Sequence, residues 1–279
     1  MKREVKKAVK GYNTIDGNGV HLVRVLGNKT YDDFDPILML DSFDTKNYDN
    51  YKGGFPLHPH RGIETISYIY QGAMEHGDSL GNKDMISDGE VQWMCAGSGI
   101  MHEEILPKSD RMLGVQLWLN LPKNNKMTTP NYKAIKNSEI KEIDIKGGKI
   151  RLLAGKFGSQ SGYLSKHLPL DYYDIHLKSG ESFSLDVENN ASIMLFTLIG
   201  EIEISNQIYT EKTAIKLSNG NKVEFSAKTD TQVLFISSIS LDEQIAWGGP
   251  IVMNTKEELY EAFRDLDNNT FVKEKIEGF

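Results

Sequence analysis

The strongest constraint on this chain is a two-residue alternation of apolar and polar side chains that recurs in many short segments. Residues 65–70, 201–205 and 222–226 all show it, and turn-forming Gly, Asn or Asp residues follow these segments. A period of two places every second side chain on one face of a strand. Many such strands at close spacing are typical of β-sandwiches and barrels. The pattern therefore predicts an all-β fold of antiparallel sheets.

The strand pattern occurs twice along the chain, with glycine turns between the strands in both halves. Its segments are 64–72, 86–93 and 113–119 in the first half, and 191–200, 215–225 and 231–236 in the second. An internal repeat of this kind indicates two copies of one small antiparallel barrel. The polar, proline-flanked stretch 121–130 is typical of a connector. We therefore predict two domains, at 1–135 and 136–279.

One segment near the end of the chain favours a helix. Asn254 or Thr255 can cap its first turn, which is acidic, and apolar residues from Leu259 to Leu266 fall on one helical face. The segment predicts a short C-terminal helix that docks on the β-structure.

Composition excludes several classes of protein. The 279 residues include 32 basic and 39 acidic side chains, giving a net charge of −7, and this acidity argues against a surface that binds nucleic acid directly. Residues 1–7 are charged and have no apolar region after them, so they do not form a secretory signal. The longest apolar runs are too short to cross a bilayer. The single cysteine suits a reducing compartment. We expect a cytoplasmic protein that does not bind membranes.

Two pairs of residues have the spacing of metal ligands. His58 and His60 are two residues apart, as are His102 and Glu104, so each pair projects to one side of an extended chain. On neighbouring strands they would offer three imidazoles and one carboxylate, which suit Fe(II), Mn, Ni, Co, Cu or Zn. Two hydrogen-bonded polar residues at a strand end are the alternative for a His-x-His pair alone. Because no histidine follows His176, only the first barrel can hold such a site.

The segments around these pairs, residues 55–65 and 92–104, resemble the signature motifs of the pirin family within the cupin superfamily. Residues 116–122 and 249–255 resemble it as well, and the likeness is strongest from 34 to 132. The resemblance implies a bicupin, in which two antiparallel β-barrels or jelly rolls pack together with a short C-terminal helix. It also implies that the N-terminal barrel binds a metal and that the C-terminal barrel does not.

The resemblance implies one divalent metal, Fe(II) first, with Mn, Ni, Co, Cu or Zn as alternatives. Its ligands would be His58, His60, His102 and Glu104. Strand alternation independently selects Glu104 over Glu103, which would point to the opposite face. The sequence departs from the family at Ser98, where arginine is usual, and at Glu103, where a small residue is usual.

Pirin-like proteins include quercetin 2,3-dioxygenases, so the resemblance implies a metal-dependent dioxygenase that cleaves a flavonol-like substrate with O2. Glu104 is the hypothesised catalytic residue, as acceptor of the substrate's 3-hydroxyl proton. The alternative is a non-catalytic metal-binding regulatory protein that modulates a transcription factor or a metabolic enzyme as its protein partner. A third interpretation is a cupin without activity.

Other residues near the motifs have structural interpretations. His76 and Asp78 are predicted to lie on a solvated hairpin beyond Gly72, with a place beside the metal site as the alternative. Glu64 is expected to pair with a neighbour such as Arg61. Core positions are predicted for Tyr68, Trp93, Cys95 and Trp118.

Overall fold

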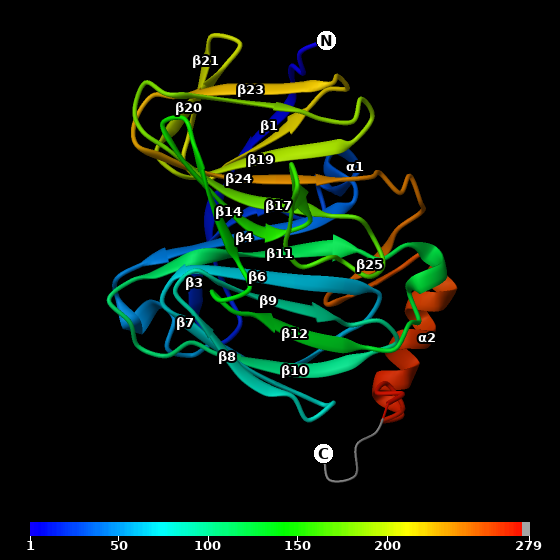
Figure 1. Ribbon diagram of the computed structural model, residues 1–279. Coiled ribbons are helices and arrows are strands. Elements are labelled where there is room, and N and C mark those ends of the chain that lie inside the picture. Colours follow the sequence, from blue (N-terminus) through cyan, green and yellow to red (C-terminus); the bar gives the residue numbers. More distant parts are fainter. Residues whose placement is uncertain (275–279) are drawn as a thin grey trace. The chain divides into compact units, whose positions relative to one another are not determined.

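The computed structural model describes residues 1–274, and antiparallel strands dominate it, which confirms the all-β prediction (Figure 1). The chain divides into two compact units. The 37–136 unit also contains residues 13–24 and the chain from 241 onward, and the 137–240 unit also contains residues 1–12 and 25–36. No helix in the described range is long and apolar enough to span a membrane.

The 37–136 unit is built from a seven-stranded and a four-stranded sheet, with a hairpin and a helix added from the C-terminal segment. The larger sheet has the order β12 (Asn131–Ile135), β9 (Glu90–Cys95), β6 (Ile63–Gln71), β11 (Met112–Asn120), β4 (Ile37–Thr45), β3 (Val20–Leu26) and β2 (Tyr12–Asp16). The smaller sheet has the order β5 (Phe55–His60), β10 (Ile100–Ile105), β7 (Ala73–Asp78) and β8 (Lys83–Ser87). The remaining elements are η1 (Tyr48–Asn50), η2 (Lys123–Asn125), β25 (Ala246–Gly248), β26 (Ile251–Met253) and α2 (Lys256–Asp267).

The 137–240 unit repeats this plan. Its seven-stranded sheet has the order β1 (Val5–Lys10), β22 (Thr213–Leu217), β19 (Ser192–Ile199), β24 (Thr231–Ser238), β17 (Asp171–Leu177), β14 (Gly148–Ala154) and β13 (Lys141–Ile145). Its four-stranded sheet has the order β18 (Ser182–Asp186), β23 (Lys222–Ala227), β20 (Glu201–Ile204) and β21 (Gln207–Thr210). The small elements are α1 (Tyr31–Phe34), β15 (Lys156–Phe157) and β16 (Gln160–Ser161).

The seven-stranded and four-stranded sheets of the two units match strand for strand, and equivalent turns use the same backbone conformation. Gly72 and Gly200 follow the equivalent strands β6 and β19, and both have positive φ, 108° and 78°. Glycine adopts this region without the steric cost that a Cβ would add. The repeated strand and glycine pattern thus corresponds to a repeated topology.

The units are not the contiguous ranges 1–135 and 136–279, because segments from both halves of the chain join the opposite unit. Residues 1–12 belong to the 137–240 unit, and the chain from 241 onward belongs to the 37–136 unit. In the 37–136 unit β12 pairs with β9 at the sheet edge, whereas in the 137–240 unit β1 takes the equivalent place beside β22. The C-terminal helix likewise belongs to the 37–136 unit. The connection between residues 136 and 137 is nevertheless one junction between the units.

The helix α2 begins where the sequence indicates. The Thr255 side chain accepts a hydrogen bond from the Glu258 N–H at 3.1 Å, and the Glu258 carboxylate accepts one from the Thr255 N–H at 3.0 Å. This capping box satisfies backbone groups that a helix start leaves unpaired. Ala262 then packs with Ile251 of β26 and with Phe271 in a small apolar cluster.

Equivalent strands of the two units carry different inward side chains. In the 137–240 unit, Phe183 on β18 and Val223 and Phe225 on β23 are buried in the apolar core. In the 37–136 unit, the equivalent strands β5 and β10 carry the histidines of the predicted ligand set. Apolar side chains thus occupy the region in one copy where imidazoles lie in the other.

Candidate metal centre

Three histidines converge in the 37–136 unit. His58 and His60 lie on β5 and His102 on β10, where His102 is the direct cross-strand partner of His58. The ring centroids are 4.3 Å apart for His58 and His102, 4.9 Å for His58 and His60, and 5.1 Å for His60 and His102. Each residue offers a ring nitrogen within 4.8 Å of the others. The spacing of the motifs and the antiparallel register together produce this triad.

Backbone carbonyls fix two of the imidazoles. The Nδ1 atom of His58 lies 2.8 Å from the Pro56 carbonyl oxygen, and that of His60 lies 2.9 Å from the Pro250 carbonyl oxygen. A carbonyl only accepts hydrogen bonds, so Nδ1 carries a proton in both rings, and Nε2 is the nitrogen that can offer a lone pair when the ring is neutral. Metal-binding histidines characteristically make this hydrogen bond through their second nitrogen.

Burial keeps the inner imidazoles neutral. Burial and then the charge of His58 lower the pKa of His60 to about 3, although its hydrogen bond to Pro250 acts in the opposite direction. Burial lowers the pKa of His102 well below its usual value, and electrostatic repulsion from the neighbouring imidazoles of His60, His58 and His76 acts in the same direction. Neutral imidazole is the form that binds metals, so at neutral pH these side chains need not lose a proton to do so.

His102 provides the clearest sign that the triad suits a metal. Its side chain is fully buried, and neither ring nitrogen has a hydrogen-bond partner within residues 1–274. A buried polar group without a partner costs about 1–3 kcal/mol. A divalent transition metal would satisfy the lone pair, and a set of imidazoles matches the preference of Fe, Ni, Cu and Zn.

Glu104 lies beside the triad but is held by two amides. It follows His102 on the inward face of β10 and is 2 % exposed. Gln92 Nε2 donates to its Oε1 at 2.8 Å, and Gln116 Nε2 lies 3.0 Å from each carboxylate oxygen. Within residues 1–274, the closely spaced group of possible ligand atoms from His58, His60 and His102 does not include a Glu104 oxygen. The assignment of Glu104 as fourth ligand therefore remains a prediction.

The likeness to known proteins agrees with this arrangement. A family model described as pirin matches residues 19–119, and one described as the pirin C-terminal cupin domain matches residues 172–272. The chain belongs to the pirin family. It is 38% identical to a pirin-like protein of Caulobacter vibrioides, over 96% of this chain and 99% of that protein. The two equivalent units are thus the two cupin domains of a pirin-type bicupin.

Solved structures share this bicupin fold. A crystal structure described as quercetin 2,3-dioxygenase from Acinetobacter baumannii matches with a TM-score of 0.89 and 31% identity, covering 97% of this chain and 99% of that one. A bacterial pirin from Escherichia coli in complex with nickel(II) matches with a TM-score of 0.66 and 21% identity, covering 84% and 98% of the two chains. At that lower identity the second likeness concerns the pirin fold alone.

The prediction that His76 and Asp78 lie on a solvated hairpin is wrong, because β7 pairs with β10 inside the smaller sheet. His76 and Asp78 are cross-strand partners of Glu104 and His102, and both are buried. His76 Nε2 lies 2.8 Å from the Asp78 carboxylate, and the His76 ring stacks on Tyr132 with 4.1 Å between centroids. Burial opposes ionisation of Asp78, but hydrogen bonds from His76 and Asn82 lower its pKa. This buried dyad borders the triad.

The expected pairing of Glu64 with Arg61 is also wrong. Arg61 donates to Asp265 at 2.7 Å and to the Phe271 carbonyl at 2.9 Å. Glu64 instead accepts hydrogen bonds from Trp93 and Cys95. The long-range contacts of Arg61 bring the C-terminal segment to the turn that follows His60. Local sequence does not reveal these contacts.

The predicted core residues are buried, and the two departures from the family differ in their exposure. Tyr68, Trp93 and Cys95 are buried, and Trp118 is 8 % exposed, with its ring 4.9 Å from that of His60. Glu103 is exposed, as strand alternation predicts, whereas Ser98 is buried. The acidic departure at 103 therefore does not add a charge beside the three imidazoles.

The sequence motifs do not identify two residues that contact Glu104. Gln92 and Gln116 are buried on β9 and β11, strands on which every residue is buried. A long amide within such an apolar strand must find a partner. A glutamine within an apolar strand therefore indicates a buried hydrogen bond, but it does not reveal that both amides contact the same carboxylate.

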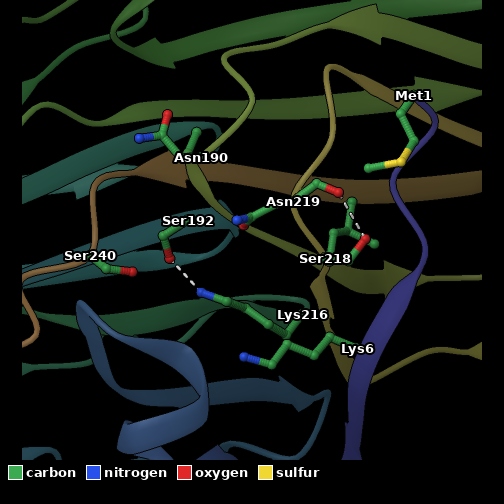
Figure 2. A pocket seen from close by; sticks show the side chains of 10 residues that line it. Met1, Lys6, Asn190, Ser192, Lys216, Ser218, Asn219 and Ser240 are labelled. Atoms are coloured by element: carbon green, nitrogen blue, oxygen red, sulfur yellow. Dashed lines mark hydrogen bonds between the residues drawn. The ribbon is translucent and has the colours of Figure 1, made fainter.

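A cavity of about 450 Å³ lies in the 137–240 unit (Figure 2). Lys6 and Lys216 line it, and Figure 2 shows the Lys216 ammonium group hydrogen-bonded to the Ser192 hydroxyl. Ammonium groups repel a cation. This cavity is therefore a poor alternative to the histidine triad as a metal site.

Replacing Glu64 by Gln should change how stability depends on pH. Burial raises the pKa of Glu64 from 4.5 to about 7, despite hydrogen bonds from Trp93 and Cys95. The folded state thus retains a proton that the unfolded state releases, and the wild type loses up to about 3 kcal/mol of stability as pH rises from 4.5 to above 7. In Glu64→Gln this loss should disappear.

Urea unfolding of the metal-free proteins at pH 5 and pH 8 measures this effect. The difference in unfolding free energy between the two pH values should shrink in the variant by about 2–3 kcal/mol. Equal pH dependence in both proteins contradicts the assigned protonation of Glu64.

Proposed function

We propose that this chain is a metal-dependent dioxygenase that cleaves a flavonol-like substrate with O2. The observation that carries the proposal is the convergence of three imidazoles, including His102 with two buried, unpartnered ring nitrogens. The Acinetobacter baumannii protein, described as quercetin 2,3-dioxygenase, supports the substrate class. The nickel(II) in the Escherichia coli pirin supports a metal in this fold.

In this proposal His58, His60 and His102 hold one divalent metal, with Glu104 as fourth ligand. Fe(II) is the first candidate, and Mn, Ni, Co, Cu and Zn suit the same donors. When bound, such a metal acts as a Lewis acid that favours the anionic form of a 3-hydroxy-ketone and brings it together with dioxygen. The carbonyls of Pro56 and Pro250 orient His58 and His60 for this role.

Glu104 is the proposed proton acceptor. Its carboxylate is buried and lies on the same face of β10 as His102. Gln92 and Gln116 keep the carboxylate oriented through their hydrogen bonds. The 3-hydroxyl proton of the substrate would move to one of its oxygens.

Metal analysis followed by oxygen uptake with quercetin tests the proposal. Protein loaded with iron, manganese or nickel should consume oxygen and release carbon monoxide, and His60→Ala should lose at least about 100-fold in rate, since it removes a ligand rather than an outer partner. His21→Ala, a change at an exposed histidine on β3, provides the control.

The outcomes separate the functional classes. A metal-loaded protein that consumes no oxygen with quercetin refutes the flavonol dioxygenase and favours the metal-binding regulatory protein. Absence of metal from both the isolated and the reconstituted protein refutes the metal centre itself.

A further inference from the structure

Two buried amides converge on Glu104 from the seven-stranded sheet. Gln92 on β9 and Gln116 on β11 both donate to its carboxylate, at 2.8 Å and 3.0 Å. Gln92 is fully buried, and Gln116 is 8 % exposed. Side chains from β9, β11 and β10 thus meet at one carboxylate, so both sheets contribute to its position.

The orientation of the Gln116 amide is fixed from both ends. Its Nε2 also lies 3.2 Å from the Ser67 hydroxyl oxygen, and its Oε1 accepts a hydrogen bond from the Trp118 indole N–H at 3.4 Å. An indole N–H only donates hydrogen bonds, so the amide oxygen must face Trp118 and the amide nitrogen must face Glu104. Trp118 also packs edge-on against His60. A continuous set of contacts therefore joins a proposed ligand, an indole, an amide and a carboxylate.

These contacts restrict a side chain that would otherwise adopt several rotamers. A free glutamate loses conformational entropy when a metal fixes it. Here the fixing is already done, because hydrogen bonds from two amides occupy both carboxylate oxygens. The same hydrogen bonds use lone pairs of the carboxylate oxygens that a metal would also use. They therefore affect which lone pair Glu104 can offer to a metal.

We propose that Gln92 and Gln116 are positioning residues that orient the Glu104 carboxylate beside the three histidines and set its contribution to metal affinity. This inference rests on the metal site of the proposed function. Neither amide needs to contact the substrate in this role. Each glutamine should instead be energetically coupled to Glu104, and this coupling is measurable without turnover.

Cobalt(II) titration, followed by visible absorption, tests the coupling. Gln116→Met and Gln92→Met keep the side-chain length but remove the donor. Each should raise the Kd for Co(II) about tenfold, the lower end of the effect of outer partners of metal ligands, and change the Co(II) absorption band. In the Glu104→Ala background, the same substitutions should change the Kd less than about twofold, because the amides then have no carboxylate to orient. Such non-additive effects are characteristic of residues that interact directly.

Gln232→Met provides the matched control, since Gln232 is a buried glutamine of the 137–240 unit that donates to Asp174 at 2.8 Å. It should leave the Co(II) Kd and spectrum unchanged. Because both glutamines are substituted separately, the test still holds if one variant fails to fold. Thermal unfolding of the metal-free proteins identifies such a variant.

Three results overturn the inference: unchanged Kd and spectrum in both glutamine variants, equal shifts with and without Glu104, or no Co(II) binding by the wild type. The last result also refutes the proposed metal centre. A coupling found in a protein without oxygen uptake supports the positioning role while refuting the dioxygenase.

Discussion

Replacing His102 by Leu should abolish metal binding without unfolding the protein. The substitution removes the fully buried member of the triad, whose two ring nitrogens lack partners in residues 1–274. Outer partners of metal ligands already change affinity about 10–100-fold, so loss of an inner ligand should raise the Kd for Ni(II) more than about 100-fold. The metal-free variant should be as stable as the wild type, because an apolar side chain replaces a buried, unsatisfied polar one.

Thermal unfolding with and without Ni(II) separates these two effects. At a free metal concentration of 100 times its Kd, the wild type should gain about 2.7 kcal/mol, and the variant should gain almost nothing. His21→Leu, at an exposed position of β3 in the same unit, should retain the full gain. Equal stabilisation of His102→Leu and the wild type by Ni(II) would show that the metal binds elsewhere.

Much of the fold follows from local sequence. Alternation locates strands such as β6, β20 and β23, and the acidic first turn after Thr255 locates α2, because side-chain periodicity and capping are properties of a few consecutive residues. The histidine triad is predictable for a similar reason. His58 and His60 are on one face of a strand by spacing alone, and only one strand pairing is needed to bring His102 to them.

The remaining features depend on contacts between distant residues. His76 and Asp78 are polar and follow a glycine turn, so local sequence favours a solvated hairpin, but pairing of β7 with β10 buries them. Arg61 has an acidic neighbour in sequence, Glu64, yet its partner is Asp265, about 200 residues later. Such choices depend on tertiary packing, which the local sequence does not reveal.

Replacing Arg61 by Met should strongly destabilise the protein near the candidate metal centre. Arg61 is 2 % exposed, and its guanidinium group donates to Asp265 and to the Phe271 carbonyl and lies 4.2 Å from the Phe271 ring centroid. Burial opposes ionisation of Asp265, but hydrogen bonds from Lys273, Arg61 and Thr270 lower its pKa to about 2. Breaking a buried pair costs about 3–5 kcal/mol, and the partial exposure of Asp265 places the expected loss near the lower value, about 3 kcal/mol.

The same change should weaken metal binding, because the C-terminal segment orients His60. The Val252 N–H donates to the Arg61 carbonyl at 3.1 Å, and the nearby Pro250 carbonyl accepts from His60 Nδ1. If the segment shifts, the Kd for Ni(II) should rise about tenfold, as expected for loss of an outer partner of a ligand.

Urea unfolding and Ni(II) titration of Arg61→Met measure the two effects, and Arg264→Met is the matched control. Arg264 is an exposed arginine of α2 next to Asp265 in sequence, and its substitution should change stability by no more than about 0.5 kcal/mol. Similar losses in both variants would attribute the effect to the helix rather than to the buried guanidinium. A stable Arg61→Met protein with normal Ni(II) affinity would mean that the C-terminal segment keeps the Pro250 carbonyl in place without Arg61, through the apolar packing of Ile251, Ala262 and Phe271 alone.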